Sequence, residues 1–167
     1  MVVVGDGVER VRRALGAQGV TAEMRTFSAE VPTAAAAAEQ LGCETGAIAN
    51  SLLFTAGDGV VLVLSSGARR VDVGRVARLL GLGRKKVRRA DPALVLQVTG
   101  QQVGGVAPVG HPTALRTLVD QELTNFDVVW AGAGDEHSMF ATTATELVAM
   151  TGGELVDVAQ PAADPGT

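Results

Sequence analysis

Two apolar, β-branched runs separated by a three-residue turn constrain the fold of this chain most strongly. Residues 51–56 (Ser-Leu-Leu-Phe-Thr-Ala) and 60–65 (Val-Val-Leu-Val-Leu-Ser) flank Gly57-Asp58-Gly59. Runs of this length and composition favour strands, and a short glycine-containing linker between them predicts a hairpin. We therefore expect a central sheet that includes this hairpin.

Helical patterns alternate with strand-like runs along the rest of the chain. Apolar residues at helical spacing and capping residues predict helices near residues 8–15, 33–41, 72–80, 92 onward and 143–150. Further strands are expected at 23–27, 115–119, 128–131 and 138–142. This order of elements is typical of an α+β domain with helices around a sheet. We expect one domain over residues 1–159 and a loose tail over residues 160–167.

Length and composition indicate an ordinary single domain. The chain has 167 residues, of which 47% are hydrophobic and 19% charged, and no apolar run approaches the roughly 18 residues of a membrane span. Residues 1–4 are too short for the core of a signal peptide, so we expect a cytoplasmic protein without a membrane partner. Cys43, the only cysteine, cannot form an internal disulfide and is expected to be a small buried side chain.

The distribution of charge is uneven. Residues 69–89 hold nine of the fourteen basic residues and one acidic residue, although the whole chain carries a net charge of −4. A basic face of this kind suits a phosphate backbone, and a solvated helix face is the alternative reading. The residues predicted to contact a nucleic-acid backbone are Arg84, Lys85, Lys86, Arg88 and Arg89.

Several common chemistries lack the residues they need. The chain has two histidines and no Gly-x-Ser-x-Gly motif, which disfavours a hydrolytic triad. One cysteine and two histidines 26 positions apart give no metal-ligand spacing, so we expect neither a metal nor a cofactor. Phosphate-binding glycine motifs of nucleotide-hydrolysing and dinucleotide-binding proteins are also missing from the sequence.

A glycine- and proline-rich segment over residues 104–112 is the strongest functional signal. Glycine allows a main chain to approach a ligand closely, and proline fixes the backbone, so such a segment can aim peptide N–H groups at one point. Aimed amides can hold the carbonyl oxygen of an ester. A tight connection between two strands would have the same composition.

Three motifs in a fixed order resemble a known family. Ile48-Ala49-Asn50-Ser51-Leu52-Leu53-Phe54 is followed by Thr99-Gly100 and then by Val103-Gly104-Gly105-Val106-Ala107-Pro108-Val109-Gly110-His111. Together they resemble the YbaK/EbsC-like aminoacyl-tRNA deacylases, which are related to the editing domain of bacterial prolyl-tRNA synthetase. The resemblance implies a compact domain with a mixed β-sheet surrounded by helices.

The same resemblance implies hydrolysis of the ester of a mischarged aminoacyl-tRNA, and a proline tRNA carrying alanine or cysteine is the expected substrate. A cognate aminoacyl-tRNA synthetase is a further candidate partner. The residues that the family's loop motif assigns to catalysis are Gly104, Gly105, Val106, Ala107 and Pro108. Candidate substrate contacts are Ser51, Thr99, Gly100, His111 and Ser138.

Asn50 is a departure from the family pattern, in which many members have lysine. Asparagine is short and neutral, and it both donates and accepts hydrogen bonds. The hypothesis is that Asn50 orients the ester carbonyl or the attacking water. The alternative is that Asn50 only begins a strand and that the chain is a non-catalytic tRNA-binding or regulatory protein.

Overall fold

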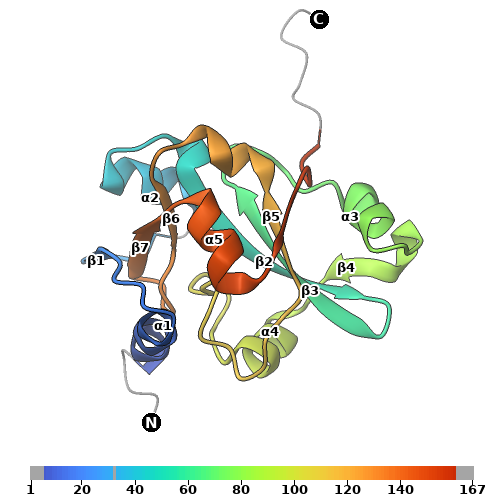
Figure 1. The fold of residues 1–167 in the computed structure, drawn as a ribbon, viewed down its shortest axis with the longest axis horizontal. Helices are drawn as coiled ribbons and strands as arrows, with labels where there is room; N and C mark the ends of the chain where they lie inside the picture. Colours follow the sequence, from blue (N-terminus) through green and yellow to red (C-terminus); the bar gives the residue numbers. More distant parts are fainter. Residues whose placement is uncertain (1–5, 32, 161–167) are drawn as a thin grey trace, which may run out of the picture.

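The computed structural model describes residues 6–31 and 33–160. Within these ranges the chain forms five α-helices, eight strands and three short 3₁₀ helices (Figure 1). The α-helices are α1 (Asp6–Ala17), α2 (Ala34–Leu41), α3 (Val73–Leu79), α4 (Pro92–Thr99) and α5 (Ala144–Thr151). The strands are β1 (Met24–Thr26), β2 (Ile48–Ala56), β3 (Gly59–Ser66), β4 (Val87–Arg89), β5 (Thr117–Asp120), β6 (Val129–Gly132), β7 (Ser138–Thr142) and β8 (Glu154–Val156).

The strands form one mixed sheet with the order β1-β7-β6-β2-β3-β5-β8, and β4 pairs with β2 off this path. The predicted hairpin is its centre, because β2 and β3 pair antiparallel from Ala49↔Ser66 to Ala56↔Gly59. On either side of the hairpin, β6 runs parallel to β2 and β5 runs parallel to β3. The α+β prediction is therefore confirmed.

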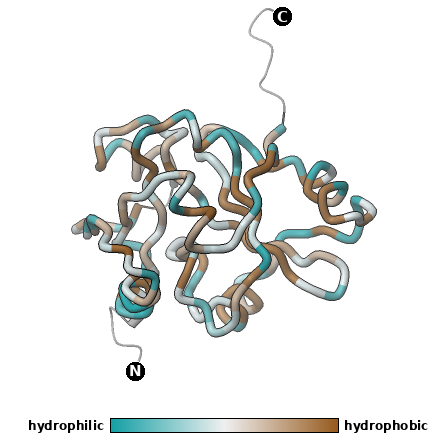
Figure 2. Tube along the Cα trace, viewed as in Figure 1, coloured by the Kyte–Doolittle hydropathy of each residue, from teal (hydrophilic) through white to brown (hydrophobic). Residues whose placement is uncertain are grey.

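Helices cover both faces of the sheet. In β3, Leu62 and Leu64 belong to a core cluster that includes side chains of α1, α4 and α5, whereas Val61 and Val63 pack with side chains of α3. This alternation follows from the two-residue period of a strand. A third cluster joins α2 to Trp130 and Met139, and Figure 2 shows apolar chain along the central strands.

Local capping explains where the helices begin and end. Four predicted caps are confirmed: the side chains of Thr33, Asp72, Asp91 and Thr143 each accept a hydrogen bond from a backbone N–H in the first turn of a helix. Such a bond satisfies one of the N–H groups that a helix start leaves unpaired. Two helices end at a glycine in the left-handed conformation: α2 at Gly42 and α5 at Gly152.

The structure differs from the sequence predictions at β4, β8 and Gln160. The basic residues predicted on and just after α3 extend through a 3₁₀ turn, Arg84–Lys86, into strand β4, which was not predicted. Strand β8 was also missed. Gln160, predicted as the first tail residue, donates its N–H to the Arg70 carbonyl at 2.8 Å, and the predicted tail residues 161–167 lie outside the described part of the chain.

Two smaller predictions concern Cys43 and membrane insertion. Cys43 is half-buried rather than buried, and it packs against the cluster beside α2. Its partial burial raises the pKa of the Cys43 thiol. None of the helices in the described ranges is long and apolar enough to cross a membrane.

Candidate functional site

The sheet contains a gap beside β2, and the gap contains the candidate site. Along one edge β2 pairs with β3 over nearly its whole length. Along the other edge the pairing with β6 ends at Ala49↔Ala131, and the pairing with β4 begins at Phe54↔Arg89. Residues 50–53 of this edge therefore face a break between two neighbouring strands.

Peptide groups of β2 point into this break at alternate residues. The carbonyl of Ile48 accepts from Gly67 on the β3 side, whereas the carbonyl of Leu53 accepts from Ala90 on the opposite side. Because peptide groups alternate along a strand, the N–H and C=O of Ser51 point to the same side as those of Leu53. No strand in the described ranges pairs with Ser51 there.

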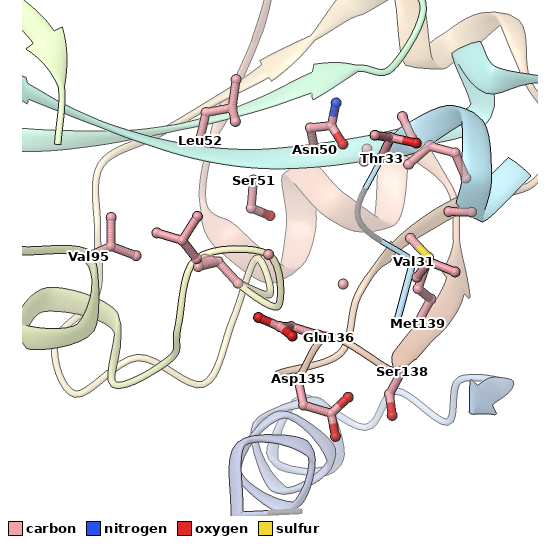
Figure 3. A pocket seen from close by; sticks show the side chains of 18 of the residues that line it. Val31, Thr33, Asn50, Ser51, Leu52, Val95, Asp135, Glu136, Ser138 and Met139 are labelled. Atoms are coloured by element: carbon pink, nitrogen blue, oxygen red, sulfur yellow. The ribbon is translucent and has the colours of Figure 1, made fainter. Parts of the chain in front are cut away.

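A cavity of about 310 Å³ lies against the break (Figure 3). Its walls come from β2, the start of α2, the Val103–Val106 segment of the glycine-rich loop, and the turn between β6 and β7. Arg89 of β4 and Val95 of α4 complete the lining. The sequence motifs around residues 50 and 104 thus meet at one cavity, although about fifty positions separate them in the chain.

Asn50 and Ser51 both line the cavity but leave β2 on opposite sides (Figure 3). The side chain of Asn50 points away from the side where Glu136 lies, whereas the hydroxyl of Ser51 points toward that side. The Ser51 hydroxyl oxygen is buried and has no hydrogen-bond partner, which is true of no other buried side-chain nitrogen or oxygen in the described residues. An unpaired buried hydroxyl costs about 1–3 kcal/mol, so a ligand that supplied the partner would recover this cost.

The glycine-rich loop begins with a tight turn at the cavity. The Gly105 N–H donates to the Gln102 carbonyl at 3.0 Å, and Gly104 has a φ of +97°, which glycine adopts readily. Gly105 packs against the backbone of Asp135, where a Cβ would lie 2.5 Å from the Asp135 carbonyl carbon. The loop and the β6–β7 turn are therefore in direct backbone contact.

The loop amides differ in availability. The N–H groups of Gly105 and Ala107 are already bonded inside the protein. The N–H groups of Gly104 and Val106 have no protein acceptor among the described residues, and both residues line the cavity. Of the N–H groups that residues 104–108 were predicted to present to a ligand, those of Gly104 and Val106 are therefore the ones without a protein acceptor in the described residues. Pro108 lies beside a second hollow of about 200 Å³.

Gln101 holds the loop in place, although no sequence pattern indicated this role. Its side chain is 2% exposed; its oxygen accepts from the Ala107 N–H at 2.6 Å and its nitrogen donates to the Val109 carbonyl at 3.3 Å. Thr99 and Gly100, predicted as substrate contacts, do not line the cavity. The Thr99 hydroxyl accepts from the Gln101 N–H, and Gly100 ends α4 in the left-handed conformation.

His111 is also separate from the cavity and lines the second hollow beside Pro108. Its Nε2 lies 2.8 Å from the Ala107 carbonyl oxygen. Burial lowers the pKa of His111, and the hydrogen bond to Ala107 opposes this shift only in part. At neutral pH the ring is uncharged and its Nε2–H donates to Ala107, so His111 braces the loop from behind.

Charged residues occupy two parts of the cavity wall. Arg89 lines the cavity, and its guanidinium carbon lies 5.7 Å from the centre of the Phe54 ring. Asp135 and Glu136 line the β6–β7 side together with Ser138. The hydrogen bond to Glu30 and the repulsion from the Glu30 carboxylate raise the pKa of Glu136.

The other predicted tRNA contacts lie outside the cavity. Arg84, Lys85, Lys86 and Arg88 are exposed residues of the 3₁₀ turn and β4, and none of them forms a salt bridge within the described residues. Arg89 follows Arg88 directly in the strand. The basic surface is thus continuous in sequence with the cavity. No metal-binding cluster of His, Cys, Asp and Glu occurs in residues 6–31 or 33–160.

The protein is a single α+β domain that has a cavity between a glycine-rich loop and a break in its sheet. Comparison with known proteins identifies its family. The model of the aminoacyl-tRNA editing domain matches residues 28–150. This chain belongs to that family, as the resemblance seen in the sequence predicted.

Similar proteins agree with this assignment. The uncharacterized protein YwhH of Bacillus subtilis (strain 168) is 31% identical over 126 residues, which cover 75% of this chain and 78% of YwhH. Proline–tRNA ligase of Thermoanaerobacter sp. (strain X514) is 31% identical over 100 residues, which cover 58% of this chain but only 17% of the ligase. The crystal structure of a proposed trans-editing enzyme for prolyl tRNA synthetase superposes with a TM-score of 0.88 at 36% identity, covering 95% of this chain and all of that chain.

Proposed function

We propose that this protein is a deacylase that hydrolyses the ester of a mischarged aminoacyl-tRNA in trans. The observation that supports this most directly is the cavity at the sheet break, which is lined by Ser51, Gly104 and Val106, three residues whose main-chain N–H groups have no protein acceptor among the described residues. Membership of the editing family makes an aminoacyl ester the natural occupant. The first substrates to test are proline tRNAs that carry alanine or cysteine.

The reaction needs little beyond positioning and charge stabilisation. Water attacks the ester carbonyl, the carbon–oxygen bond to the terminal ribose breaks, and the products are the free amino acid and a tRNA with a free hydroxyl. Negative charge develops on the carbonyl oxygen during the attack, and fixed N–H donors stabilise it. The loss of one such donor typically costs about 100-fold or more in rate.

In this proposal Asn50 replaces the lysine of many family members. Its side chain amide donates to the ester carbonyl or holds the attacking water, since an amide can do either. Asn50 lies on β2 at the cavity wall, beside the first residues of α2. A short neutral side chain cannot supply the charge of lysine, so main-chain donors carry more of the stabilisation here.

Arg89 and the exposed basic residues bind the tRNA. Arg89 lies at the cavity, so its guanidinium contacts the phosphate nearest the aminoacylated end. Arg84, Lys85, Lys86 and Arg88 contact phosphates farther along the acceptor stem. Arginine and lysine bind phosphate by charge without reading sequence.

Apolar side chains beside α2 favour a small amino acid. Val31, Ala34, Ala37 and Met139 line this part of the cavity. Free-standing editing is needed for small errors, because a synthetase pocket discriminates a methylene by only about 1–3 kcal/mol. A prolyl-tRNA synthetase is the candidate partner, since proline–tRNA ligases contain the matching segment.

A non-catalytic tRNA-binding protein is the second candidate, and Asn50 in the family lysine position favours it. One experiment separates the two functions: incubation of the purified protein with a panel of labelled aminoacyl-tRNAs. The proposal predicts release of alanine or cysteine from proline tRNA, and release slows in Asn50→Ala. Binding of tRNA without loss of any ester would support the second candidate, and unchanged rates in both Asn50→Ala and Asn50→Lys would remove Asn50 from the site.

A further inference from the structure

The cavity has an acidic wall without a cationic partner. Asp135 and Glu136 line it on the β6–β7 side, and Glu136 interacts with the exposed Glu30. No salt bridge joins these three carboxylates to Lys, Arg or His within the described residues. Asp135 uses one oxygen to accept the His137 N–H at 2.8 Å. Glu136 faces another carboxylate, Glu30, rather than a cation, so a cationic ligand would be favoured beside it.

Glu136 is placed directly over the glycine-rich loop. A Cβ on Gly104 would lie 3.5 Å from both Cγ and Oε1 of Glu136. Because the Gly104 N–H is one of the proposed donors to the ester carbonyl, Glu136 lies beside the position of that carbonyl. The α-nitrogen of an aminoacyl ester is two bonds from the carbonyl carbon, so it falls within the same neighbourhood.

Ser51 lies on β2, on the wall of the cavity opposite Glu136, and its hydroxyl provides independent evidence for a ligand. Its buried hydroxyl has no partner, and Figure 3 shows it pointing from β2 toward the side of the cavity where Glu136 lies. The Ser51 carbonyl also faces the sheet break, where β2 has no neighbouring strand. A protonated amine has three N–H donors and no acceptor, and these groups supply three acceptors.

We infer that Ser51 and Glu136 form a subsite for the protonated α-amine of the aminoacyl group. This inference deepens the proposed function and rests on it. The Glu136 carboxylate pairs with the ammonium group, and the Ser51 hydroxyl accepts one of its hydrogen bonds. Glu30 stays beside Glu136, and the arriving cation relieves the repulsion between the two carboxylates that raises the pKa of Glu136.

The subsite predicts which esters the protein accepts. An ester with a free α-amine carries the positive charge, whereas an N-acylated ester has a neutral, bulkier nitrogen. Aminoacyl-tRNA would therefore bind, and tRNA carrying a blocked or peptidyl group would be rejected. This selectivity would spare the growing chain and initiator-type esters from hydrolysis.

The experiment compares two non-hydrolysable probes by calorimetry: 3′-alanylamino-3′-deoxyadenosine and its N-acetyl derivative. In the wild-type protein the free amine is expected to bind 10-fold to 100-fold more tightly, since a charge-assisted hydrogen bond contributes this much. Glu136→Gln should reduce the ratio toward one, and Ser51→Ala should reduce it in part. The control Glu9→Gln, at an exposed position of α1, should leave the ratio of the two affinities unchanged.

The outcomes separate this inference from the proposed function. Equal affinity of the wild-type protein for both probes would overturn the amine subsite and leave the deacylase proposal intact. An unchanged preference in both Glu136→Gln and Ser51→Ala would likewise overturn the assignment to these residues. Failure of both probes to bind would overturn the proposed function and the subsite together. Ser51→Ala should be at least as stable as the wild-type protein, because the substitution removes a buried hydroxyl that has no hydrogen-bond partner.

Discussion

Replacement of Gly105 by alanine should disrupt catalysis through a backbone collision. A Cβ at this position would lie 2.5 Å from the carbonyl carbon and 2.6 Å from the Cα of Asp135. Non-bonded carbons rest about 3.5–4.0 Å apart, so the loop and the β6–β7 turn must separate by about 1 Å. A displacement of about 1 Å in a positioned group can cost on the order of 100-fold in rate.

Two measurements test this prediction on the same protein. The rate of aminoacyl-tRNA hydrolysis should fall about 100-fold in Gly105→Ala, and the free energy of unfolding in urea should fall by about 1–3 kcal/mol, as expected for overpacking. Gly16→Ala is the matched control: it lies in α1 with open space around its Cβ position. This control should keep full activity and gain about 0.5–1 kcal/mol. Wild-type activity in Gly105→Ala would refute the claim that the loop position controls the chemistry.

Three further predictions concern the loop supports and the basic surface. Gln101→Met leaves two buried backbone groups unpaired and should lower the free energy of unfolding in urea by about 2–5 kcal/mol. The control Gln102→Met, at the exposed neighbouring position, should change that free energy little. Equal effects of the two substitutions would contradict the role assigned to Gln101. Burial lowers the pKa of His111 below its ordinary 6.5, so the folded protein binds this proton less tightly than the unfolded chain does. The free energy of unfolding should therefore fall as the pH drops below about 6.5. His111→Gln should flatten this dependence in urea titrations between pH 5 and 8, and a curve identical to that of the wild-type protein would contradict the prediction. Lys85→Glu combined with Lys86→Glu should weaken tRNA binding and reduce its salt dependence without changing the melting temperature, and unchanged affinity would move the tRNA contact elsewhere.

Local chemistry explains why much of the fold could be predicted. The hairpin and the four helix caps depend on residues that are close in sequence, so each was visible without the structure. Strands β4 and β8 were missed; three residues give little pattern, although β1 is equally short and was predicted. Two of the three residues in β4 are arginines, which do not read as a strand.

The candidate site was predictable only in part, for reasons of long-range geometry. The motif around Asn50 and the glycine-rich loop could be found, but the sheet break between β6 and β4 depends on strand order, which no local pattern specifies. Gln101 and Gln102 are neighbours with the same side chain, and only the fold shows that the first is buried and the second exposed. The role proposed for Glu136 depends on the packing of the β6–β7 turn on Gly105, which no local pattern specifies.

Amide chemical-shift mapping with a non-hydrolysable aminoacyl adenosine tests the central claim most directly. If the cavity at the sheet break holds the aminoacyl end, the largest shifts will occur at the N–H groups of Ser51, Gly104 and Val106. Shifts confined to the hollow beside Pro108 and His111, or no shift at saturating probe, would contradict the account.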